Sequence, residues 1–387
     1  MTKSKWVGGI LNVFVPGLGY FYARDRRKAV ITYLLFVTFL IVPYRFLAYS
    51  FPVFLSGVIL ILGFQVWLFF SGYRAVRNEE YDQSRADHPM VYVGVIVFHV
   101  LFAMLIQTRD YDNVFPIRSA SVPTNAMDPA LQVGDKFTYQ VTKSIDRGDV
   151  TIFQWPYDTK TMYVMRCVGM PGDSLYVKDG VVLVNGIPFA NVNVRRKRTV
   201  VTDGSPVSRR ELSQNSIDES EIRPSGSNSY IMSLTNDQAD ALKKLPNVKR
   251  IEETTSLQFD AGNMIYPNDD SISVRWSTDN FGPMYIPKKG DRLQLTKENI
   301  ILYQKCIAFE NASVERAGPA IRVDGKEIAI YEFKQDYYFT IGDNRDNAYD
   351  SRFWGLVPHE LVIGKAMYLF WSSSERIGIS LAYSKSN

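Results

Sequence analysis

Apolar residues are unevenly distributed along the chain, and the pattern changes near residue 107. Before that point, stretches at about 29–47, 52–72 and 90–106 are long and apolar enough to span a bilayer, which takes roughly 17–25 residues. After it, short stretches such as KFTYQVT, DVTIFQW and MYVMRCV alternate polar and apolar residues with the period of a β-strand. The pattern predicts a membrane domain of transmembrane α-helices over residues 1–107 and an all-β domain over residues 108–387.

The segment at residues 7–22 is also apolar, but Pro16 and four glycines interrupt it. A cleaved signal peptide is one interpretation, because Lys3 and Lys5 precede the segment. The sequence lacks a small-residue cleavage site there, and a basic cluster follows directly. These features favour an interfacial or re-entrant segment.

Basic residues flank the expected spans asymmetrically. One group precedes the first span and another lies between the second and third: Arg24, Arg26, Arg27 and Lys28, then Arg74, Arg77 and Arg85. Loops rich in Lys and Arg stay on the cytoplasmic side, so everything after Thr108 is expected to be extracytoplasmic. His99, inside the third span, is expected to have a packing role.

The β-rich domain contains a stretch of different character at residues 191–300. Asp179-Gly180, Asn185-Gly186 and Asp324-Gly325 on either side of it are typical hairpin turns. The stretch opens with the basic run 195–198, which we interpret as a solvated loop. A single helix is predicted within it, from a capping box at Thr235 and Gln238 to Pro246. The stretch is therefore expected to be a small α+β insertion.

Composition excludes several classes of function. The net charge is +4, and no basic block is interleaved with aromatic residues as a nucleic-acid groove requires. The two cysteines form no CxxC pair and the three histidines no His-rich cluster, so no metal or cofactor is expected. A Ser-His-Asp triad would depend on His359 alone. Whether Cys167 and Cys306 form a disulfide stays open.

Four segments carry more specific information: PTNAMDPALQVGD at 123–135, DRGDVTIF at 146–153, YVMRCVGMPGD at 163–173 and IGDNRDNAYDSRFWG at 341–355. In this order they resemble the signature boxes of bacterial type I signal peptidases. The tract at 276–291 resembles the longer form of this enzyme in Bacteroidetes-type bacteria. The resemblance implies a multi-pass protein of the bacterial inner membrane with a periplasmic β-domain. Its partners would be membrane lipids and the signal peptides of preproteins.

Active members of this family use a serine nucleophile, a lysine general base and a second serine that positions the lysine. The matching positions in this chain are Ala126, Met165 and Ala348, so the resemblance implies that no catalytic residue is intact. Thr124 matches the oxyanion-hole hydroxyl, and the second donor would be the backbone N–H of Ala126. Four charged residues match the groups that brace the site: Asp343, Arg345, Asp350 and Arg352. The peptide-binding residues cannot be assigned from the sequence.

The three replacements are chemically consistent with one another. Methionine keeps an apolar stem where lysine would bury a charge. Alanine at 348 avoids an unpaired buried hydroxyl, which costs about 1–3 kcal/mol. The preferred hypothesis is an inactive homologue that binds signal peptides, or that associates with an active peptidase or the secretion machinery.

Two alternatives remain open. The chain is an active endopeptidase if a serine at 119 or 121 attacks with a lysine from the insertion as base. Lys160 is no substitute for that base, because it lies five residues before Met165 and so faces the opposite side of a strand. The second alternative is a structural subunit of a membrane complex.

Overall fold

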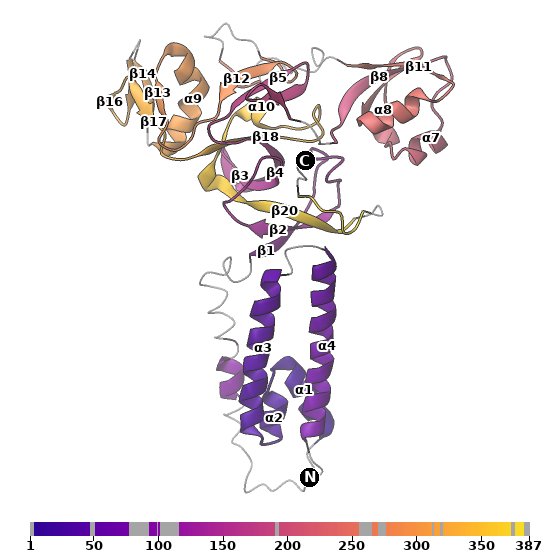
Figure 1. Cartoon of the computed structure of the whole chain (residues 1–387), viewed down its shortest axis with the longest axis vertical. Coiled ribbons are helices and arrows are strands. Elements are labelled where there is room, and N and C mark those ends of the chain that lie inside the picture. The colour runs from indigo at the N-terminus through magenta and orange to yellow at the C-terminus, as the bar shows by residue number, and fades with distance from the viewer. Residues whose placement is uncertain are drawn as a thin grey trace. The chain divides into compact units, whose positions relative to one another are not determined.

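The computed structural model describes residues 4–46, 51–76, 93–98, 100, 116–189, 193–254, 265–269, 276–311, 313–317, 320–372 and 376–382. The chain forms two compact units, drawn in Figure 1. One comprises Met1–Ser119 with Ile377–Ser380, and the other comprises Ala120–Arg376 with Leu381–Asn387.

The first unit is helical, with α1 (Lys5–Phe14), α2 (Leu18–Tyr22), α3 (Arg26–Phe46) and α4 (Phe51–Ala75). The segment expected to be interfacial or re-entrant forms the two short helices, which separate at Pro16 and Gly17. Within the described residues, one helical stretch, Leu55–Ala75, is long and apolar enough to cross a membrane. Residues 93–98 and 100 of the third expected span are helical, whereas His99, Arg77 and Arg85 lie outside the described residues.

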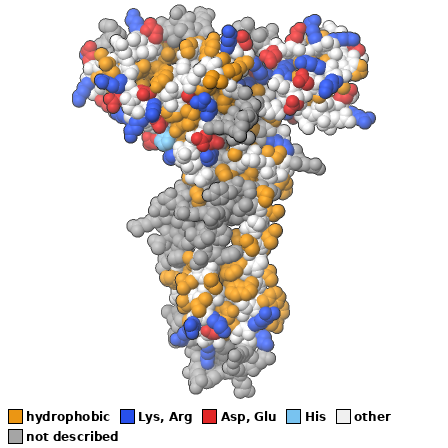
Figure 2. Space-filling view, in the orientation of Figure 1, with side chains coloured by type: hydrophobic (Ala, Val, Ile, Leu, Met, Phe, Trp, Pro, Cys, Tyr) orange, Lys and Arg blue, Asp and Glu red, His pale blue; other side chains and the backbone are white. Residues whose placement is uncertain are grey.

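Small residues and one buried amide pack α1 against α4. The side chain of Asn12 is fully buried, donates to the carbonyl oxygen of Leu68 at 2.8 Å and accepts the N–H of Gly17 at 2.8 Å. Gly8 and Gly72 lie so close that a Cβ on either would clash with the other's backbone. Figure 2 shows apolar side chains over this unit and Lys and Arg side chains at one end of it.

Two antiparallel sheets make up the body of the second unit. The larger has the order β1-β2-β20-β3-β4-β18-β19 and the smaller the order β12-β5-β6-β7. Their bounds are β1 (Ile117–Ser121), β2 (Lys136–Val141), β3 (Val150–Trp155), β4 (Asp158–Gly169), β5 (Ser174–Lys178), β6 (Val181–Val184), β7 (Ile187–Pro188), β12 (Phe281–Tyr285), β18 (Tyr337–Ile341), β19 (Val357–Pro358) and β20 (Val362–Trp371). This sheet-rich architecture is consistent with the expected β-domain.

The predicted hairpin turns are confirmed. Asp179-Gly180 joins β5 to β6 and Asn185-Gly186 joins β6 to β7, each with positive φ at both residues. Asp324-Gly325 joins β15 (Ala320–Val323) to β16 (Lys326–Glu327) in the same way. The remaining elements of the body are β13 (Arg292–Gln294), α9 (Lys297–Glu310), β14 (Val314–Ala317), β17 (Ile330–Glu332), α10 (Ser351–Trp354) and η5 (His359–Leu361).

Residues 196–253 of the stretch expected as an insertion form a sheet of their own, with the order β11-β8-β10-β9, whereas β12 and β13 of the same stretch pair with strands of the body. The elements of residues 196–253 are β8 (Arg196–Thr202), α7 (Arg209–Gln214), η2 (Glu219–Glu221), β9 (Arg223–Gly226), β10 (Ser229–Leu234), α8 (Asn236–Lys243) and β11 (Val248–Glu253). This segment has a small core of its own around Val200, Leu234 and Leu242.

The predicted helix is confirmed as α8, with both hydrogen bonds of the Thr235–Gln238 capping box. The prediction of a single helix is wrong, because α7 follows a second capping box at Ser208 and Glu211. Six residues are too few for a helical period to show in the sequence.

The interpretation of the basic run as a solvated loop is also wrong. Arg195 is 3% exposed, and Arg196 and Arg198 are largely buried. The Nε of Arg195 lies 2.9 Å from Oδ2 of Asp128, and its Nη1 donates to the carbonyl oxygen of Ser233 at 3.0 Å. Its backbone N–H donates to the carbonyl oxygen of Asp343 at 2.9 Å. The run therefore attaches the insertion to two loops of the body.

We expect Arg195→Met to lower the free energy of unfolding by about 3–5 kcal/mol, because it leaves the Asp128 carboxylate buried without its counter-charge. Adding Asp128→Asn should recover part of that loss, since the double variant removes both charges. Denaturant unfolding of the detergent-solubilised protein measures both effects. Arg250→Met, at an exposed pair on β11, is the control and should change stability by less than about 0.5 kcal/mol. Equal stabilities for the Arg195 and Arg250 variants would contradict the assignment.

Candidate functional site

Three residues from distant parts of the chain meet beside Gly342. Ala126 lies in the loop between β1 and β2, Met165 on β4, and Ala348 in the loop between β18 and α10. A Cβ built on Gly342 would touch the Ala348 methyl, and would lie 2.6 Å from the Ala126 carbonyl oxygen and 3.5 Å from the Met165 sulfur. The three side chains are 9%, 3% and 5% exposed. The positions singled out from the sequence therefore share one small volume, and Gly342 has to be glycine.

These residues adjoin a cavity of about 330 Å³, which we call the apolar cavity. Its lining is Val122, Pro123, Thr124, Ala126, Met127, Leu131, Thr161, Met162, Tyr163, Val164, Met165, Asn347 and Tyr349. Among the described residues, no serine, lysine, histidine or carboxylate lines it. Its hydroxyl groups belong to two threonines and two tyrosines.

The other sequence candidates fall at and around this cavity. Thr124 is exposed and lines it. Ser119 and Ser121 are exposed on β1 and Lys160 is exposed on β4, and none of the three lines it. Among the described residues, the apolar cavity is therefore lined by neither a serine nor a lysine.

Two buried ion pairs brace the loop that carries Gly342 and Ala348. Asp343 accepts from Nε and Nη2 of Arg166 at 2.8 and 2.6 Å. Asp350 accepts from Nε and Nη2 of Arg352 at 2.9 and 2.8 Å, and from the N–H of Gly342 at 3.1 Å. Arg166 was not among the residues expected to brace the site, although it directly follows Met165 in the third of the four motif segments.

Arg345 acts differently from the other bracing residues. Burial, followed by the nearby guanidinium of Arg352, lowers the pKa of Arg345 to about 10. Its backbone makes the contacts: its N–H donates to the carbonyl oxygen of Arg195 at 3.0 Å, and its carbonyl oxygen accepts from Arg352 at 2.5 Å. Arg345 therefore links the insertion to the ion pair of Asp350.

Asn344 fixes the loop that carries Asn125 and Ala126. Its backbone N–H donates to the carbonyl oxygen of Ala126 at 3.1 Å, and its side-chain amide donates to that of Asn125 at 3.1 Å. Asp128 lies two residues after Ala126. Burial raises the pKa of its carboxyl group, while the guanidinium of Arg195 lowers it. The loop is thus held by hydrogen bonds and an ion pair.

A second cavity of about 640 Å³, which we call the polar cavity, lies on the other side of this loop. Its lining is Asn125, Lys197, Glu221, Arg223, Ile231, Ser233 and Asn347. Ser233 on β10 pairs directly with Lys197 on β8, which only the strand register reveals. The Ser233 hydroxyl donates to Oδ1 of Asn344 at 3.2 Å, and Nζ of Lys197 donates to the carbonyl oxygen of Asp346 at 3.3 Å.

Cysteines and possible metal ligands are the remaining candidates for a functional site. Cys167 and Cys306 are both free and buried, which answers the open question of a disulfide between them. Among the described residues, no group of three or more His, Cys, Asp or Glu side chains is placed to hold a metal ion.

Comparison with known proteins agrees with this geometry. The family model described as "Signal peptidase, peptidase S26" matches residues 90–249 and 286–371, more than half of the chain. Signal peptidase I of Buchnera aphidicola subsp. Baizongia pistaciae is 23% identical over 265 residues, which cover 64% of this chain and 68% of that protein. Its counterpart from Buchnera aphidicola subsp. Acyrthosiphon pisum is 26% identical over 281 residues, covering 67% and 71%. Signal peptidase I of Helicobacter pylori strain 26695 is 34% identical over 109 residues, covering 28% and 37%. The chain belongs to the signal peptidase family, peptidase S26, as a type I member.

Proposed function

We propose that this protein is a catalytically inactive type I signal peptidase homologue that binds the signal segments of preproteins without cutting them. One observation carries the proposal: Ala126, Met165 and Ala348 meet beside Gly342, and their side chains end in methyl and thioether groups only. Peptide hydrolysis by a serine dyad needs a hydroxyl within reach of a neutral base. The parts of such a dyad act as a unit, so their joint absence leaves activity near background.

The apolar cavity is suited to peptide side chains. Val122, Leu131 and Val164 offer apolar walls, and Thr124 offers a hydroxyl at an exposed position. A volume of about 330 Å³ is at the small end of ligand pockets, which matches one or two small residues better than a bulky one. The bound segment is therefore an extended peptide with small side chains ahead of the former cleavage point.

The site also contains an observation in favour of a second function. Ser233 and Lys197 are cross-strand partners that line the polar cavity together. A serine and a lysine are the residue types that an active peptidase needs. In the structure, however, each donates to a different oxygen, of Asn344 and of Asp346. A Ser233–Lys197 endopeptidase is the runner-up.

We further propose that the helical unit anchors the protein in the bacterial inner membrane through three spans, with the β-domain in the periplasm. The apolar stretch Leu55–Ala75 supports one span, and α3 coincides with another expected span. Arg24 before α3, Arg26, Arg27 and Lys28 in its first turn, and Arg74 at the end of α4 support a cytoplasmic location of those two helix ends.

A reporter enzyme that works only outside the cytoplasm tests this topology. Fused after residue 382, it should be active, because the β-domain then lies outside. Fused after residue 76, it should be inactive. Activity after residue 76, or inactivity after residue 382, would contradict the proposed orientation.

The proposed function predicts binding without cleavage. The purified protein in detergent should bind a fluorescent signal-peptide probe and leave a preprotein uncut under conditions where an active relative cuts it. Thr124→Trp should abolish binding by filling the apolar cavity, whereas Ser121→Trp, exposed but outside the cavity, should not. Cleavage that Ser233→Ala or Lys197→Met abolishes would establish the runner-up instead. Equal binding by the two tryptophan variants would contradict peptide binding in this cavity.

Restoring only the lysine should destabilise the protein. Met165→Lys buries an ammonium without a counter-charge, so it should lower the free energy of unfolding by about 3–5 kcal/mol at pH 7. Burial lowers the pKa of such a lysine, so the folded state binds fewer protons than the unfolded state. The loss should therefore shrink as the pH rises and vanish near about pH 10.4.

The matched control for that prediction is Met162→Lys, on the same strand but 55% exposed, which should cost less than about 0.5 kcal/mol at any pH. Thermal unfolding measured across a pH series compares the two variants. A Met165→Lys protein as stable as Met162→Lys at pH 7 would mean that the site already accommodates a charge.

A further inference from the structure

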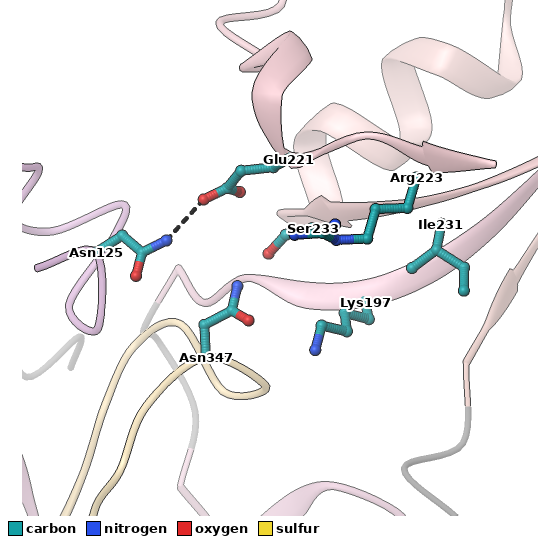
Figure 3. A pocket seen from close by; sticks show the side chains of 7 residues that line it. All are labelled: Asn125, Lys197, Glu221, Arg223, Ile231, Ser233 and Asn347. Atoms are coloured by element: carbon teal, nitrogen blue, oxygen red, sulfur yellow. Dashed lines mark hydrogen bonds between the residues drawn. The ribbon is translucent and has the colours of Figure 1, made fainter. Parts of the chain in front are cut away.

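We infer that the polar cavity is a second peptide subsite, which binds an acidic segment following the former cleavage point of the peptide held in the apolar cavity. The inference rests on the proposed function, because it concerns the continuation of the same bound peptide. Nothing in the sequence pointed to this cavity. It is formed by the insertion on one side and by two motif loops on the other, as Figure 3 shows.

The two cavities are neighbours across a single stretch of chain. Thr124 and Ala126 line the apolar cavity, while Asn125 between them lines the polar cavity. Asn347 lines both. A peptide that leaves the apolar cavity at Ala126 therefore comes directly to the polar cavity.

The charges of the polar cavity favour an acidic occupant. Arg223 on β9 is exposed, and no hydrogen bond or ion pair engages its guanidinium among the described residues. Lys197 brings a second cation, whereas Glu221 brings one carboxylate. The lining thus has an excess of positive charge, and a guanidinium binds a carboxylate through two parallel hydrogen bonds.

Glu221 supplies a second, independent sign of a ligand. Its Oε1 accepts from the Asn125 amide at 2.8 Å, but its Oε2 is buried and has no hydrogen-bond partner among the described residues. A buried oxygen without a partner is unfavourable and is usually satisfied by a bound donor. The backbone N–H of a peptide crossing the cavity would be that donor, while Arg223 would take an acidic side chain.

Three fluorescent peptides that share one signal segment test the inference on the full-length protein in detergent. One continues past the cleavage point with a short acidic segment, one continues with a basic segment, and one ends at the cleavage point. The wild-type protein should bind the acidic peptide most tightly. Arg223→Glu should lower the affinity for the acidic peptide by about tenfold. It should leave the affinity for the truncated peptide unchanged and raise the affinity for the basic peptide. The discrimination should decrease at high salt.

Lys249→Glu is the matched control. Lys249 is exposed on β11 of the same sheet, does not line the cavity, and its reversal changes the net charge by the same amount. It should alter no affinity by more than about twofold. The inference would be overturned if the wild-type protein bound the acidic and basic peptides equally, or if Arg223→Glu and Lys249→Glu had equal effects. In either case, binding of the truncated peptide would still uphold the proposed function. Failure of the wild-type protein to bind the truncated peptide would overturn both.

Discussion

The buried ion pair of Arg195 and Asp128 is the contact on which the rest of the site depends. It joins the first residue of the insertion's basic run to the loop that carries Ala126. The backbone of the same arginine bonds to Asp343 and Arg345 in the last motif loop. One residue therefore fixes three segments, and the polar cavity exists because the insertion sheet is held at this place. Separating the two side chains would be costly in free energy, because each charge would then be buried without a partner and without water.

The preserved motif residues say little about catalysis by themselves. Asp343 with Arg166, and Asp350 with Arg352, are buried pairs in which losing one partner costs about 3–5 kcal/mol. Stability alone is enough to keep both pairs, whether or not the protein cuts peptides. The side chains at 126, 165 and 348 carry the proposed function instead, because all three are apolar and pack into one cluster inside this frame.

The hairpin turns and the cap of α8, which depend on short-range sequence patterns, were predicted correctly from the sequence. The turn at Asp179-Gly180 and the capping box at Thr235 depend on neighbouring residues, and the structure confirms both. Motif spacing also identified three residues that meet beside Gly342. The burial of Arg195 could not be predicted, because its partner Asp128 lies 67 residues earlier and a run of arginines usually faces water. The polar cavity escaped prediction for the same reason, since it needs the register that places Ser233 opposite Lys197.

A peptide site that only binds has different requirements from one that also cuts. An active peptidase gains rate only from interactions that are stronger in the transition state than in the bound substrate, and it must release the segment after the cut. A site that does not cut holds a continuous chain, so contacts on both sides of the uncut bond add to one binding energy. Asn347, shared by the two cavities, lies where such a chain would pass from one to the other. A polar cavity beside an apolar one is therefore of more use to a binder of whole preproteins than to an enzyme that releases one half of them.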